Sequence, residues 1–176
     1  MKRHLVIPLA VAFLLLCSIG MAQGEEKMAM KIGYFDPAED WEPLDLNIAV
    51  GVDFTVKEDE KSKILVSAHW ANEESSEANV EVKGNLWNVL GTYLLKAPRR
   101  EGAKTGLSYG AGVGWYQMKL EVAGVSASED TLGFHVVAVY DITKRLKAEV
   151  KYGFAEKDNV KFDGLLVSVG YKVIAK

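Results

Sequence analysis

The sequence contains one cysteine and four prolines, and after its first 22 residues it has no long hydrophobic run. Because Cys17 lies in the N-terminal apolar stretch, the rest of the chain has no disulfide, thiolate metal site or cysteine nucleophile. A transmembrane helix needs about 20 consecutive apolar residues, and this part of the chain offers none. Any segment of it that crosses a membrane must therefore belong to a closed β-barrel.

Positive charge is also scarce. The chain has 21 lysines and arginines against 24 aspartates and glutamates. The first 22 residues contain two of the basic residues and no acidic one, so the remainder has a net charge of 19 minus 24, or −5. Nucleic-acid binding depends on clustered lysines and arginines, so this balance argues against a nucleic-acid partner.

The N-terminus has the three-part pattern of a secretory signal peptide. Two basic residues precede an apolar stretch from Leu5 to Ile19, and the small residues Gly20 and Ala22 follow. The apolar stretch is about 15 residues long, which is too short to span a bilayer as an anchor. We therefore expect residues 1–22 to be a cleaved signal peptide and residues 23–176 to be one exported domain.

A period of two dominates the rest of the chain. Between Leu44 and Lys57, seven apolar residues occupy every second position, which is the pattern of a β-strand with one apolar face. A helix would instead group its apolar residues three and four positions apart. The same alternation occurs in residues 28–35, 64–70, 107–115, 132–140, 146–154 and 164–173.

One further segment, Val80 to Leu95, is apolar on both parities and would also fit a helical stripe. Gly91 weakens a helix, and Trp87 and the β-branched residues near it favour a strand. We interpret this segment as a strand with a bulge near Gly84. We expect a second bulge after Trp115, where the apolar parity changes.

These eight segments predict an all-β fold, a single eight-stranded antiparallel up-and-down β-barrel. Neighbouring segments are joined by short polar connections, which almost force antiparallel pairing. The predicted connections are Asp36–Pro43, Lys57–Lys63, Ala71–Asn79, Lys96–Lys104, Ala123–Asp130, Asp141–Arg145 and Ala155–Lys161.

The apolar face of a barrel points inward in a soluble protein and toward lipid in an outer-membrane protein. Three features favour the membrane. The polar parity is rich in glycine and mixes both signs of charge, which suits a narrow lumen. The aromatic residues gather near the ends of the apolar faces, as interfacial girdles do. The first, third, fifth and seventh connections are together strongly acidic, whereas the other three are weakly basic.

Parts of the chain resemble the small OmpA/OmpX-type outer-membrane β-barrel proteins. Val139 to Tyr152 looks like their penultimate hairpin, Leu165 to Val173 is similar to their last strand, and the glycine-rich Tyr109 to Trp115 also fits. The resemblance implies a Gram-negative outer membrane, periplasmic termini and acidic loops outside the cell. It also implies contact with lipid, lipopolysaccharide and the barrel-assembly machinery, and a monomer. These proteins usually end on an aromatic residue, and Val173 holds that place here.

The charged and imidazole side chains of the polar parity predict a network that fills the lumen. The interior of an eight-stranded barrel is normally filled by side chains, so a structural ladder is expected and not a pore. The candidate members are Asp45, Asp53, His69, Glu81, Lys83, His135, Lys147, Glu149 and Lys151.

The leading hypothesis for function is a non-enzymatic outer-membrane barrel that stabilises the envelope or presents surface loops. Ser67 and His69 share a face, as a hydrolytic pair would, but no local motif supplies the orienting acid that such a pair needs. We therefore expect no catalytic residue, metal or cofactor. Two alternatives stay open: a lipid-modifying outer-membrane barrel enzyme, and a soluble periplasmic β-barrel that carries an apolar ligand.

Overall fold

A computed structural model describes residues 28–37, 47–77, 80–98, 105–122, 124–157, 160, 161 and 163–173. The predicted signal peptide, residues 1–22, and the candidate lumen residue Asp45 lie outside these ranges. Among the residues that are described, no helix is long and apolar enough to cross a membrane.

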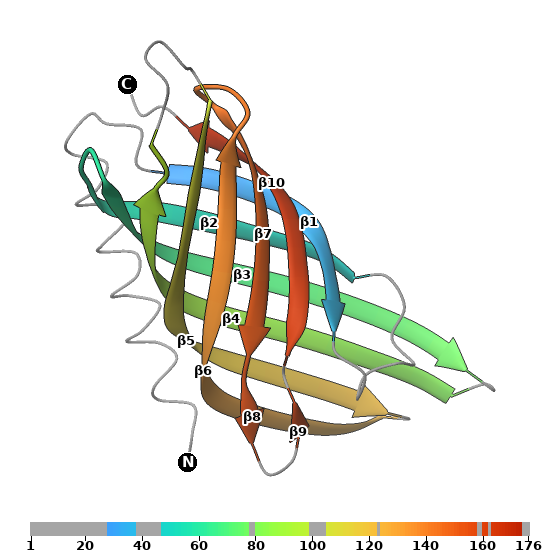
Figure 1. Cartoon of the computed structure of the whole chain (residues 1–176). Coiled ribbons are helices and arrows are strands. Elements are labelled where there is room, and N and C mark those ends of the chain that lie inside the picture. The colour runs from blue at the N-terminus through green and yellow to red at the C-terminus, as the bar shows by residue number, and fades with distance from the viewer. Residues whose placement is uncertain are drawn as a thin grey trace.

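Eight strands close into an antiparallel barrel, in which β10 pairs with β1 and the other strands pair with their neighbours in sequence (Figure 1). The predicted fold class is therefore confirmed. A two-stranded hairpin, which the sequence did not predict, interrupts the connection from β7 to β10. The strands are β1 (Met28–Pro37), β2 (Asn47–Glu58), β3 (Ser62–Glu77), β4 (Val80–Lys96), β5 (Gly106–Val122), β6 (Val125–Asp141), β7 (Leu146–Phe154), β8 (Glu156–Lys157), β9 (Val160–Lys161) and β10 (Gly164–Val173).

The large apolar side chains of the alternating pattern point away from the barrel. Met30 and Ile32 on β1 are each 61% exposed, and Leu132 on β6 is 79% exposed. The opposite side of each strand faces the interior, where charged residues such as Lys31 and Glu149 are almost fully buried. This arrangement is the reverse of a soluble barrel and matches a barrel that is surrounded by hydrocarbon.

The two predicted bulges are wrong. Strand β4 pairs with both neighbours without a register shift near Gly84, and β5 continues past Trp115 in the same way. Leu90, Leu94 and Tyr116 consequently point inward and are at most 4% exposed. The prediction failed because it assumed that all apolar residues face outward, whereas part of this interior is apolar. In the described barrel strands, the one register shift lies where β2 pairs with β3, after Thr55.

The strands differ in length. β3, β4, β5 and β6 have 16, 17, 17 and 17 residues, whereas β1, β2, β7 and β10 have 10, 12, 9 and 10. The predicted connections Ala71–Asn79 and Ala123–Asp130 are therefore too long, since β3 continues to Glu77 and β6 begins at Val125. About 9–11 residues suffice to cross a bilayer. The two hairpins β3–β4 and β5–β6 thus extend well past the other strands, at the end of the barrel away from the end of β10 (Figure 1).

Candidate functional site

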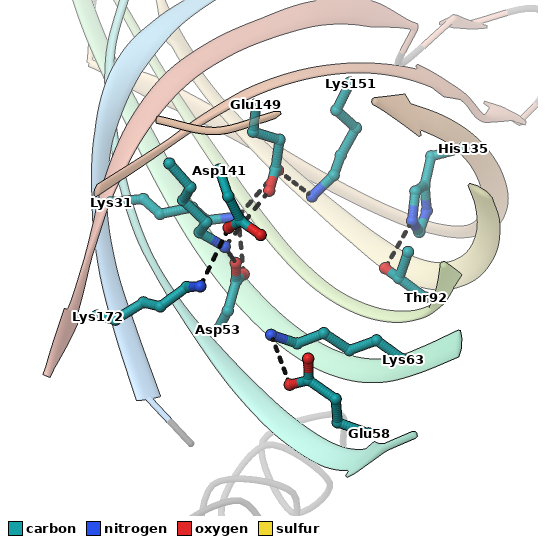
Figure 2. A network of polar contacts seen from close by, with 11 residues as sticks. Lys31, Asp53, Glu58, Lys63, Thr92, His135, Asp141, Glu149, Lys151 and Lys172 are labelled. Carbon is teal, nitrogen blue, oxygen red and sulfur yellow. Dashed lines mark hydrogen bonds and ion pairs between the residues drawn. The ribbon is translucent and has the colours of Figure 1, made fainter. Parts of the chain in front are cut away.

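Five charged side chains from β1, β2 and β7 meet inside the barrel (Figure 2). We call Lys31, Asp53, Lys147, Glu149 and Lys151 the charged cluster. Lys31 Nζ lies 2.7 Å from Asp53 Oδ1 and 2.9 Å from Glu149 Oε1. Lys151 Nζ lies 2.9 Å from the same Glu149 oxygen. Lys147 donates to Asp53 Oδ2, and its Nζ lies 3.8 Å from Glu149 Oε2. The cluster thus joins strands that are distant in sequence.

The period of two explains how the sequence builds this cluster. Lys147, Glu149 and Lys151 occupy alternate positions of β7, so all three side chains enter the interior on one face. Lys31 reaches them past Gly170, which is its partner on β10. A Cβ at this glycine would lie 2.7 Å from Lys147 Cε and 3.0 Å from Lys31 Cγ, so any larger residue would force the two lysine side chains to shift.

All five members of the charged cluster are at most 5% exposed. Buried charges are costly unless they are paired, and here each ammonium group lies close to at least one carboxylate. Three lysines face two carboxylates, which leaves the cluster with one excess positive charge. The members therefore depend on one another, since removing either carboxylate leaves three buried lysines facing a single carboxylate.

Two buried histidines hydrogen-bond to polar side chains of β4. His69 Nδ1 lies 2.8 Å from Asn88 Oδ1, and because an amide oxygen only accepts, Nδ1 donates this bond. His135 Nε2 lies 2.9 Å from Thr92 Oγ1. His135 has no exposed surface and sits over Gly112, where a Cβ would lie 2.6 Å from the imidazole. These contacts are typical of a packed polar interior.

The structure does not bring Ser67 and His69 together as a catalytic pair. Ser67 Oγ is buried and has no hydrogen-bond partner among the described residues, while His69 is bonded to Asn88. Ser67 therefore has no base as hydrogen-bond partner among the described side chains. Among all described residues, no group of three or more histidine, cysteine, aspartate or glutamate side chains is placed to hold a metal ion.

Aliphatic side chains occupy the other side of the interior. Leu65, Leu94, Val137 and Val139, from β3, β4 and β6, form a buried group that we call the apolar cluster. Two further buried groups contain Leu90 with Tyr116 and Ala155, and Ala49 with Ala71 and Leu166.

A small cavity lies between the charged cluster and the barrel end at which β10 finishes. Its volume is about 10 Å³, which is room for about one water molecule. Lys63 and Lys172 line it together with Asp53 and Lys147. These two outer lysines also form ion pairs, Lys63 with Glu58 at 3.4 Å and Lys172 with Asp141 at 3.0 Å.

The structure distributes the nine predicted network residues unevenly. Six of them are buried in the barrel, namely Asp53, His69, His135, Lys147, Glu149 and Lys151. Lys83 lies on the outer side of β4 with Trp87, because the expected bulge is absent. The side chains of Asp45 and Glu81 lie outside the described part of the protein.

Sequence reasoning missed three polar residues that bond to the predicted network, Lys31, Asn88 and Thr92. Lys31 shares the parity of Gly33 on β1, opposite to the apolar residues. The alternation of this strand was therefore sufficient to place Lys31 on the inner face. Asn88 and Thr92 would have been found by continuing the alternation of β4 without a bulge.

The sequence matches one protein-family model, described as the outer membrane protein beta-barrel domain, over residues 9–172. No curated protein sequence matches the chain significantly. The family match covers nearly all of the described barrel.

Several solved structures share the fold. Neisserial surface protein A has 10% sequence identity and a TM-score of 0.59, with 83% of this chain and 96% of that chain covered. Ail of Yersinia pestis, in complex with the heparin analogue sucrose octasulfate, has 16% identity and a TM-score of 0.56, with 84% and 98% covered. The N-terminal β-barrel domain of Pseudomonas aeruginosa OprF has 11% identity and a TM-score of 0.53, with 86% and 100% covered. At these identities the likeness establishes the fold alone.

Proposed function

Because this chain belongs to the outer membrane protein beta-barrel family, we propose that it is a non-enzymatic barrel with a closed lumen, which acts through the hairpins that extend outside the cell. The protein is a small outer-membrane barrel of the OmpA/OmpX type. The alternative of a soluble periplasmic carrier is therefore wrong, and the outward apolar side chains give the physical reason.

The closed lumen is supported by what occupies the interior. The charged cluster reaches across it from β1 and β2 to β7, and the apolar cluster packs against the walls of β3, β4 and β6. The cavity next to the charged cluster has room for about one water molecule, whereas conduction needs a continuous file of water. We expect no stepwise conductance when the protein is inserted into a planar bilayer.

The absence of enzymatic activity is supported by the geometry around Ser67 and His69. Ser67 is 1% exposed inside the barrel, where neither a lipid headgroup nor a solvent-borne substrate reaches its hydroxyl. His69 is engaged by Asn88. An activated serine requires a base within hydrogen-bond distance, and that base must itself be oriented by a third group.

The proposed interaction surface lies on the extended hairpins β3–β4 and β5–β6. Residues 71–83 and 117–131, which include the hairpin ends, contain seven acidic and two basic residues. Near the ends of β5 and β6, Lys119, Glu129 and Asp130 are exposed. An acidic surface that stands above the membrane attracts cationic partners and repels polyanions. We therefore propose a basic peptide segment as partner, in contrast to Ail, which was solved with a heparin analogue.

The proposed partners also include the membrane itself. Lipid and lipopolysaccharide surround the outward apolar face, and insertion requires the barrel-assembly machinery. We propose that the protein works as a monomer, since its closed barrel leaves no sheet edge for a second copy to extend.

Binding to charged probes tests this function. The mature chain, inserted into lipid nanodiscs, is titrated with fluorescent oligolysine and with sucrose octasulfate at low and moderate salt. We expect oligolysine to bind with an affinity that falls as salt rises, and sucrose octasulfate not to bind. The double variant Glu129→Lys/Asp130→Lys should weaken oligolysine binding by about tenfold.

The control is a charge reversal of the same sign and size at the other end of the barrel, Glu58→Lys/Glu60→Lys, which should leave oligolysine binding unchanged. Equal binding by all three proteins, or stronger binding of sucrose octasulfate, would overturn the proposal for the hairpins.

A further inference from the structure

The outer wall of the barrel contains an apolar groove that the proposed function does not use. It extends from Leu146 on β7 across β10, β1, β2, β3 and β4 and has a volume of about 780 Å³. This volume lies in the range of ligand pockets, about 300–1,000 Å³. Its lining is almost entirely apolar, so water is a poor occupant and hydrocarbon a good one.

The strand register explains the shape of this groove. Tyr171, Met30, Val52 and Ala68 are successive partners across β10, β1, β2 and β3, so their outward side chains form one row. Ala68 is the smallest member of the row and leaves a depression in the wall. The rings of Trp70 and Trp87, whose centroids are 6.1 Å apart, form the end of the groove on β3 and β4. Tyr171 stands at the other end, on β10.

The length of the groove suits one acyl chain. Five neighbouring strands about 4.8 Å apart span about 20 Å. The hydrocarbon core of a bilayer is about 30 Å thick, so a tilted path of this length takes a chain from one surface to about the middle. A chain that starts at the β10 end thus fits within a single leaflet.

Positive charge marks the β10 end of the groove. Arg145, in the turn between β6 and β7, is exposed, and its Nη1 lies 3.2 Å from the hydroxyl oxygen of Tyr171. Lys144 beside it is also exposed. No described carboxylate forms an ion pair with Arg145 in the structure. A guanidinium group in this position can bind a phosphate through paired N–H donors.

We propose that this groove binds one anionic glycerophospholipid, with an acyl chain between Tyr171 and the Trp70–Trp87 pair and its phosphate on Arg145. The end of β10 lies opposite the long hairpins, so the lipid belongs to the periplasmic leaflet. This choice of leaflet rests on the proposed function, which places the hairpins outside the cell. The lipid site itself depends only on the barrel lying in a membrane.

Native mass spectrometry of the full mature chain in a mild detergent tests the site. Phosphatidylglycerol is titrated against the wild type, Ala68→Phe, which fills the depression, and Arg145→Glu, which reverses the charge. We expect one phosphatidylglycerol to bind more tightly than the rest, and each variant to weaken this binding by about tenfold. Slower migration of the heated sample on SDS gels checks that each variant is folded.

Two matched controls accompany these variants. Ala138→Phe makes the same substitution on the lipid-facing side of β6, outside the groove, and Lys61→Glu reverses a charge at the same end of the barrel. Both should bind phosphatidylglycerol as the wild type does.

Three results would overturn the lipid site. The first is equal phosphatidylglycerol binding by all five proteins, which indicates a shell of unspecific lipid only. The second is equal binding of a zwitterionic phosphatidylcholine, which removes the role of Arg145. The third is preferential binding of rough lipopolysaccharide that Ala68→Phe weakens, which assigns the groove to the outer leaflet. Failure of the oligolysine experiment would leave the lipid result intact, so the two proposals fail separately.

Discussion

The two sides of the barrel interior are filled by different chemistry. On β1, β2 and β7 the charged cluster holds three lysines and two carboxylates. On β3, β4 and β6 the apolar cluster holds four aliphatic side chains. Both are buried to a similar degree, with no member more than 7% exposed.

The difference shows that a lumen does not have to be polar in order to be packed. An aliphatic side chain needs only neighbours of the right shape, so truncating one residue of the apolar cluster leaves a cavity but no unpaired charge. A buried ion needs its partner, so the charged cluster holds together as a unit. The following predictions test this contrast, beginning with the largest expected effect.

Replacing Glu149 should be the most damaging single change in the interior. Its Oε1 atom accepts from both Lys31 and Lys151, so Glu149→Leu leaves two buried ammonium groups with fewer counterions. We expect the free energy of unfolding to fall by about 3–5 kcal/mol. Urea unfolding in lipid vesicles, followed by tryptophan fluorescence, measures the change.

The double variant Glu149→Leu/Lys151→Met tests the cause of that loss. It removes one ammonium group together with the carboxylate, so it should be more stable than Glu149→Leu alone. If the second substitution instead adds its own full cost, the members of the charged cluster act independently, and the contrast between the two sides disappears.

Leu94→Ala should have the next largest effect. Leu94 is 2% exposed in the apolar cluster, and its truncation leaves a cavity that costs about 2–4 kcal/mol. The control is Leu95→Ala on the same strand, because Leu95 faces outward, is 42% exposed and should cost less than about 1 kcal/mol in the same unfolding experiment. Equal losses would show that Leu94 is not packed inside the barrel.

Thr92→Val probes the border between the two sides. The threonine hydroxyl is buried 2.9 Å from His135 Nε2, and valine has the same shape without the hydrogen bond. We expect a loss of about 1–2 kcal/mol, because a buried imidazole nitrogen is left without a partner. Thr131→Val is the control, since the hydroxyl of Thr131 is exposed and a surface change of this kind should cost no more than about 0.5 kcal/mol.

The smallest effect is expected in the turn between β2 and β3, outside the lumen. The backbone N–H of Lys61, and both the hydroxyl and the N–H of Ser62, donate to Asp59 and lower the pKa of its carboxyl below the ordinary 3.8. A lowered folded-state pKa stabilises the fold above pH 3.8, and this stabilisation is lost as the pH falls through the folded value. Asp59→Asn should remove this acid dependence, which NMR titration of the carboxyl and unfolding between pH 2 and 5 would reveal. An unchanged acid profile would contradict this role.

Much of the fold could be predicted from the sequence, because a single barrel sheet makes the two faces of every strand chemically different. The alternation that begins at Leu44 predicted β2, and the same reasoning found six further barrel strands, whereas β4 was assigned from Gly91 and its β-favouring residues. The strand ends were less predictable, since the polar residues of the hairpin β5–β6 have the composition of a loop and still pair up to Val122 and Val125.

The candidate site was only partly predictable. Lys147, Glu149 and Lys151 share one face of β7 on sequence grounds alone. Their partner Lys31 lies 118 positions from Glu149, and no local pattern joins the two residues. The inward direction of Leu90 and Tyr116 was missed because their apolar character matches a lipid-facing position equally well.

The sequence by itself determined that the chain alternates, that no stretch after residue 22 is long and apolar enough for a membrane-spanning helix, and that any membrane crossing there must be a closed barrel. These properties follow from the period of two and from the need to satisfy every backbone group in lipid. Only the tertiary structure decided which residues share the interior, because closing the barrel places β10 beside β1 and fixes the register of every pair. That closure brings Asp53 and Lys147 into contact and gives Lys31 its two carboxylates. It also brings four aliphatic side chains of β3, β4 and β6 together.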